Sequence, residues 1–174
     1  MITPNSAHPA LAVGGGVVHS LLAIGCMLTW LCTRRSGWIS ASWLWMAVVQ
    51  AFFAVDSIVG IRLIIAEAGR EYFTHHGWYD ERRPMQMVLT LAAIIAVLMI
   101  IRFISLAQGT SATHRMAVVG TGIVLALFLN SAISLHQTGD FSLSLAGRVL
   151  GCGLTGVGLG LGIRNACLSD KLKL

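Results

Sequence analysis

Charged residues are scarce in this chain. Only 11% of its 174 residues are charged and 56% are hydrophobic, whereas about a quarter of the residues in a typical soluble domain are charged. The mean hydropathy is +0.78. A soluble domain of this size cannot bury so much apolar surface in one core. The scarcity of charge therefore excludes the ordinary soluble globular class.

Cysteine motifs are missing as well. The four cysteines form no CxxC pair and have no histidine-rich spacing around them, which argues against zinc and thioredoxin-type sites. They are Cys26, Cys32, Cys152 and Cys167. Two lie in apolar runs, where cysteine behaves as a small hydrophobic residue. The other two lie at expected cytoplasmic helix ends, where thiols stay reduced, so we expect four free thiols.

The start of the chain has no basic residue. No Lys or Arg precedes the first apolar run, so this segment lacks the charged region of a signal peptide. No small-residue cleavage site clearly follows the run either. We therefore expect the run to be retained as a membrane span.

Long apolar runs are what the chain has in abundance. Each is close to the length of about 20 residues that crosses a bilayer as a helix, and they lie at about 12–32, 42–65, 86–106, 116–136 and 143–163. The pattern predicts an all-α integral membrane protein, a single membrane domain over residues 1–174 with five transmembrane helices. Because Arg148 interrupts the last run, four spans plus a re-entrant or interfacial final segment is the alternative.

The basic residues predict an orientation. The net charge is +5, and because the basic residues are scattered through short loops we expect them to orient the protein in a membrane, with no nucleic-acid partner. With the N-terminus outside, seven fall on the cytoplasmic side: Arg34, Arg35, Arg102, Arg115, Arg164, Lys171 and Lys173. Four fall outside: Arg70, Arg82, Arg83 and Arg148. This predicts a multi-pass protein of the inner (plasma) membrane with a cytoplasmic C-terminus.

Residues 67–84 are predicted to form a polar, aromatic outer loop. Its candidate functional residues are His75, His76, Tyr79, Asp80, Glu81, Arg82 and Arg83. The histidines with a carboxylate suit a metal, and the arginines suit a phosphate, a lipid headgroup or a quinone oxygen. A His–Asp pair suits general acid–base chemistry. A solvated interfacial helix with salt bridges is the alternative without a ligand.

Ionisable residues within the spans indicate a second candidate site. Asp56 lies about halfway along the second run, where a carboxylate is costly in lipid and should face the bundle interior. It is either a proton or cation site or a paired carboxylate that joins two helices. Arg62 lies about 240° further around the same helix, so we expect it to snorkel to the outer interface rather than pair with Asp56.

Other polar residues share the outer half of the expected bundle. They are His19, Asn130, His136 and Arg148. A continuous second helix would place Asp56 about 15–20 Å from His75. We therefore expect Asp56 and the outer loop to form one site, lined at intermediate depth by His19, Asn130 and Arg62.

The last run is rich in glycine. Residues 151–156 match the GxGxxG pattern of dinucleotide-binding proteins, but they lie inside an apolar run with no strand before it, which excludes that reading. Glycines four residues apart allow helices to approach closely in lipid. We expect Gly151, Gly156 and Gly160 to serve helix packing.

Three functions remain open from the sequence. The first is a transporter, ion-conducting unit or ligand-binding subunit with an outward-facing polar site, in a homo-oligomer or with other membrane subunits. The second is a membrane enzyme acting on a lipid or isoprenoid, with Asp56, His76 and Asp80 as acid–base groups. The third is a structural subunit of a respiratory or photosynthetic assembly. The one cofactor that the sequence raises is a haem b held between His19 and His136.

Overall fold

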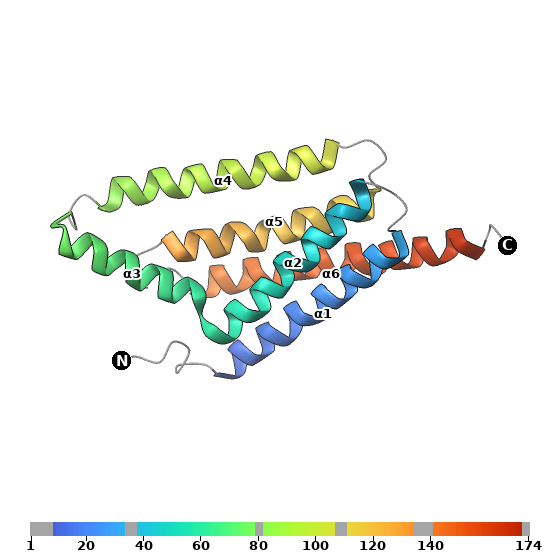
Figure 1. Cartoon of the computed structure of the whole chain (residues 1–174), viewed down its shortest axis with the longest axis horizontal. Coiled ribbons are helices and arrows are strands. Elements are labelled where there is room, and N and C mark those ends of the chain that lie inside the picture. The colour runs from blue at the N-terminus through green and yellow to red at the C-terminus, as the bar shows by residue number, and fades with distance from the viewer. Residues whose placement is uncertain (1–8, 34–37, 79–81, 107–110, 134–140, 172–174) are drawn as a thin grey trace.

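A computed structural model (Figure 1) describes residues 9–33, 38–78, 82–106, 111–133 and 141–171 of the chain. Its regular structure, within these residues, is entirely helical. The helices are α1 (Pro9–Thr33), α2 (Trp38–Val59), α3 (Ile61–His75), α4 (Arg82–Leu106), α5 (Ala112–Ile133) and α6 (Phe141–Lys171).

Four of these helices are long and apolar enough to cross a membrane. The qualifying stretches are Val13–Thr33, Ser40–Val59, Ala112–Ile133 and Leu145–Arg164. A shorter apolar stretch, Gln86–Arg102, lies within α4. The prediction of an all-α, multi-pass protein in contact with a lipid bilayer is confirmed by these helices. The final run, which Arg148 interrupts, forms part of a single helix of 31 residues.

α4, α5 and α6 run along the long axis of the bundle, α1 and α2 cross it obliquely, and α3 lies at the end where α1 begins (Figure 1). α1 packs closely on α2, and α5 packs closely on α6. α1 also touches α6, while α4 packs on α5. The start of α1 and the end of α6 lie at opposite ends of the bundle (Figure 1).

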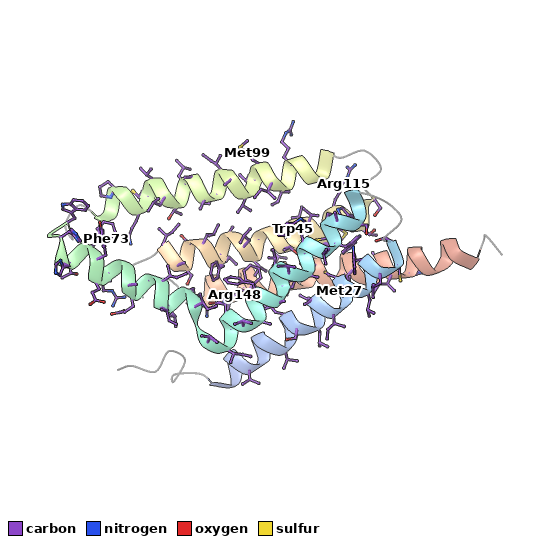
Figure 2. The ribbon with its side chains drawn as sticks, viewed as in Figure 1. Met27, Trp45, Phe73, Met99, Arg115 and Arg148 are labelled. Atoms are coloured by element: carbon purple, nitrogen blue, oxygen red, sulfur yellow. The ribbon has the colours of Figure 1, made fainter. Side chains whose placement is uncertain are left out.

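The outer surface carries large apolar side chains. Trp45 is 69% exposed and Met99 is 67% exposed, and Met99 projects away from the rest of the bundle (Figure 2). In water so much exposed apolar surface would form an aggregation-prone patch. In a bilayer the lipid tails cover it, because they are as apolar as these side chains.

The apolar core lies between α1, α2, α5 and α6. Its buried members are Leu22, Cys26, Trp43, Met46, Ala47, Ala117, Val118 and Leu159. Cys26, Cys32 and Cys152 are free thiols; the side chain of Cys167 lies outside the described part of the chain.

Glycines bring α5 and α6 into backbone contact. A Cβ atom on Gly120 would lie 2.5 Å from the Gly151 carbonyl oxygen, and one on Gly158 would lie 2.5 Å from the Thr113 carbonyl oxygen. Only a residue without a side chain fits at such distances. The contact face of α6 therefore follows Gly151 and Gly158.

The other two glycines that the sequence selected for packing lie elsewhere. A Cβ on Gly156 would meet only a methyl group of Leu22, at 3.7 Å, which is ordinary contact. A Cβ on Gly160 would meet no atom within 4 Å in the described part of the chain. Within the single chain, neither glycine is required for close approach of helices.

A glycine separates α2 from α3 in the middle of the second apolar run. Gly60 has φ 74° and ψ 38°, a left-handed conformation that L residues with a side chain adopt at a cost. Its amide donates to the carbonyl of Asp56 at 2.7 Å, and its carbonyl accepts from Leu63 at 2.8 Å. One helix thus ends and the next begins in a new direction. The expected continuous helix over 42–65 is wrong, and part of the expected loop over 67–84 is helical.

Candidate functional site

The break at Gly60 folds Arg62 back onto Asp56. The Arg62 guanidinium forms an ion pair with one carboxylate oxygen of Asp56, and the Arg62 backbone amide donates to the other at 2.9 Å. The side chains are 14% and 3% exposed, respectively. The expectation that Arg62 snorkels away from Asp56 is therefore wrong. The 240° separation assumed one straight helix, and the left-handed residue between them removes that assumption.

A small cavity lies beside this ion pair. Its lining residues are His19, Phe53, Asp56, Ser57, Val124, Phe128 and Arg148, contributed by α1, α2, α5 and α6. The cavity leaves about 10 Å³ for the centre of a water-sized sphere, close to the least that one water molecule needs. Arg148 and the α2–α3 junction lie toward the same end of the bundle, whereas Arg115 lies at the opposite end (Figure 2).

A chain of hydrogen bonds leads from the cavity into the bundle. His19 Nδ1 lies 2.7 Å from Gln50 Oε1, and Gln50 Nε2 donates to Thr121 Oγ1 at 3.2 Å. Thr121 Oγ1 is 3.5 Å from Thr155 Oγ1, which donates to the Gly151 carbonyl at 2.9 Å. The four side chains are buried and come from four different helices. The chain thus ties α1, α2, α5 and α6 together at one level.

The hydrogen bond to Gln50 determines which ring nitrogen of His19 carries the proton. Because the amide oxygen of Gln50 accepts, His19 Nδ1 must carry a hydrogen and donate it. In the neutral ring, Nε2 then keeps its lone pair, and it lies 4.0 Å from the Cys152 thiol. His19 therefore faces the cavity in one tautomer and one orientation. In other polar sites, too, a hydrogen bond at one ring nitrogen sets the state of the other nitrogen.

A second polar cluster lies near the other end of the bundle. His114 Nε2 is 3.2 Å from Ser42 Oγ, and the ring packs edge-on against Trp43 at 5.1 Å. His114 is 2% exposed, and its Nδ1 has no hydrogen-bond partner among the residues that the structure describes. On α5 it lies seven positions, about 10 Å, from Thr121, and the buried core residues Ala117 and Val118 lie between the two.

Of the remaining residues that the sequence placed in the outer half, Asn130 does not line this cavity. Asn130 is exposed on α5. His136, the second histidine of the expected haem b site, lies outside the described residues. Both ring nitrogens of His19 already face Gln50 and Cys152, and the cavity is far smaller than a porphyrin.

The two described loop candidates, His75 and His76, lie away from the ion pair. His75 ends α3, and His76 packs its ring on Tyr72 at 4.2 Å. α3 has 15 residues, so about 20 Å separates these histidines from Arg62. Within the residues described here, no three His, Cys, Asp or Glu side chains come together as a metal site. Tyr79, Asp80 and Glu81 lie outside the description, as do the side chains of Arg82 and Arg83, which begin α4.

Three members of the site were missed at the level of sequence. They are Gln50, Thr121 and Thr155, polar but uncharged residues within the apolar runs. A signal existed, because both threonines stand next to glycines within apolar runs, at Gly120–Gly122 and at Gly156. A hydroxyl beside a glycine is well placed to bond across a close helix contact.

Comparison with protein-family models, with curated proteins and with solved structures finds no match.

Proposed function

We propose that this protein is a small ion-translocating unit of the membrane, a transporter or channel with its polar site in the outer half of the bundle. One observation carries the proposal. His19, Asp56 and Arg148, from three different helices, line one cavity inside the bundle, and Arg62 of a fourth helix pairs with Asp56 there.

The cost of these groups supports a functional role. Helix packing in lipid needs only small residues and neutral hydrogen bonds, and the contacts of Gly120, Thr121 and Thr155 supply both. Ionisable side chains at membrane depth are expensive and typically mark an ion or substrate pathway. The ion pair and Arg148 exceed what the packing of this bundle requires.

We also propose that α4 is a fifth span, with the N-terminus outside and the C-terminus in the cytoplasm of a cell with an inner (plasma) membrane. Its apolar stretch of 17 residues is about 26 Å long, close to the hydrocarbon thickness of about 30 Å. α4 lies alongside α5, and the chain ends on the side opposite to the start of α1 (Figure 1). α3 would then lie at the outer interface.

A further part of the proposal is self-association through α6. Gly153 and Gly160 are exposed and seven residues apart, so they share a helix face on which a second copy or another membrane subunit can pack. Gly160→Leu should reduce the oligomer size of the purified protein in detergent. An unchanged size would show that this face looks onto lipid.

Flux measurements on the purified protein in liposomes test the main proposal. We expect the wild type to dissipate an imposed ion gradient and His19→Gln to slow this strongly. His75→Gln, the same change at an exposed position at the end of α3, should leave the flux unchanged. A wild type without flux of any ion would contradict the proposal: turnover of a lipid would then favour the enzyme, and stable co-purification with other subunits would favour the structural role.

A further inference from the structure

The charges at the cavity do not cancel. Both carboxylate oxygens of Asp56 already accept from Arg62, one from the guanidinium and one from the backbone amide. That amide belongs to the first turn of α3, where the free N–H groups of a helix attract an anion. Asp56 therefore acts as the built-in anion of Arg62 and of the α3 N-terminus. A cation entering the cavity would have to displace Arg62 from it.

Within the described part of the chain, Arg148 is left without a counter-ion. It lines the same cavity, yet no carboxylate among the residues that the structure describes lies within 4.0 Å of its guanidinium. Arg148 sits within the apolar stretch Leu145–Arg164 of α6, at a depth where a charge without a partner is costly. Because Asp56 is paired with Arg62, Arg148 leaves the described lining of the cavity with an unbalanced positive charge.

We propose that this cavity binds a small inorganic anion, with the Arg148 guanidinium as its principal ligand. The proposal rests on the proposed ion-translocating function and names the class of ion. The space is close to that of one water molecule, which fits a halide or a similarly compact anion and is too small for an organic acid.

The apolar lining strengthens the attraction. Phe53, Val124 and Phe128 complete the wall of the cavity, and two of them are 2% and 4% exposed. Where water is largely excluded, a unit charge interacts with its partner more strongly than at a solvated surface. An anion at this position would be held by one guanidinium and shielded from the bilayer by aromatic rings.

The test uses the purified full chain in liposomes loaded with potassium salts of fluoride, chloride, nitrate or acetate, with valinomycin to balance charge. We expect efflux of fluoride or chloride, with nitrate and acetate slower because they are larger than the cavity. Arg148→Gln should slow that efflux about tenfold or more, because it removes a charged hydrogen bond. Arg164→Gln, the same change at an exposed position of α6, should have no effect. Arg148→Lys keeps the charge and should retain part of the efflux.

Different results would contradict the anion site and the ion-translocating function. If the wild type dissipates a proton gradient, or a potassium gradient imposed without valinomycin, but moves none of the four anions, the cavity is not an anion site although ion translocation stands. If anion efflux is the same in Arg148→Gln as in the wild type, the assignment to Arg148 is wrong. If no ion moves at all, the proposed function fails as well. A monodisperse profile and an unchanged helical spectrum establish that each variant is folded.

Discussion

The close contact between α5 and α6 makes the Gly120→Ala variant a sharp test of the fold. The new methyl group would lie 2.5 Å from the Gly151 carbonyl oxygen and 2.6 Å from the Thr155 amide nitrogen, whereas ordinary contact begins near 3.4 Å. Both neighbours are backbone atoms of a helix and cannot rotate away. The two helices must separate by about 1 Å, and overpacking of this kind costs about 1–3 kcal/mol.

Gly153→Ala and Gly160→Ala are the matched controls. A Cβ at either position meets no atom within 4 Å among the described residues. Replacing a mid-helix glycine with alanine removes backbone freedom from the unfolded chain. This raises the free energy of unfolding by about 0.5–1 kcal/mol. The three substitutions are chemically identical, so only the packing around each position distinguishes them.

Unfolding in detergent, followed by circular dichroism as the fraction of sodium dodecyl sulfate is raised, gives the comparison. We expect Gly120→Ala to unfold at a lower fraction than the wild type, and the two controls at an equal or higher one. The reasoning would be refuted if Gly120→Ala were as stable as Gly160→Ala, because α5 and α6 would then not meet at Gly120.

Three further predictions follow from the site and the topology. Asp56→Asn should lower the free energy of unfolding by about 3–5 kcal/mol, because Arg62 is left buried without its partner, and the same detergent titration measures it. Gln50→Leu should cost about 1–3 kcal/mol, since it strands the Nδ1–H of His19 in an apolar bundle; stability equal to wild type would show that the hydrogen-bond chain does not form. Reporter fusions at Gly109 and at the C-terminus should both score cytoplasmic, and an external C-terminus would remove the fifth span.

The membrane class of the fold was readable from the sequence because lipid imposes a simple rule. A backbone that crosses the hydrocarbon must satisfy its own polar groups, so a long apolar run becomes a helix. The runs near residues 12–32 and 116–136 correspond to α1 and α5 with small differences at their ends. The break in the second run was not readable from hydropathy, which is as high before Gly60 as just after it.

The pairing of Asp56 with Arg62 depends on one backbone conformation. With Gly60 in a helical conformation the two side chains would point in different directions, and with φ at 74° they meet. A glycine in an apolar run can pack against a neighbouring helix or end its own helix, and sequence alone does not separate these uses. The consequence for function is large, because it turns Asp56 from a candidate cation site into the partner of an arginine.

The sequence alone does not show which glycines of α6 contact a neighbouring helix. Several glycine pairs in this helix have packing spacings, and they point to different sides. The face used inside the bundle is decided by Gly120 on α5, which stands opposite Gly151. Only the position of the neighbouring helix resolves such a choice.

The central claim is that the charges at the cavity serve ion translocation and not merely the packing of the bundle. The Asp56→Asn/Arg62→Gln/Arg148→Gln triple variant tests this most directly, because it removes the ion pair and the unpaired charge at the cavity and keeps polar side chains of similar size. The measurement is its ion flux in liposomes beside that of the wild type, with detergent stability as the check on folding. The account predicts a folded protein, more stable than Asp56→Asn alone, whose flux is strongly reduced; flux equal to wild type would contradict it.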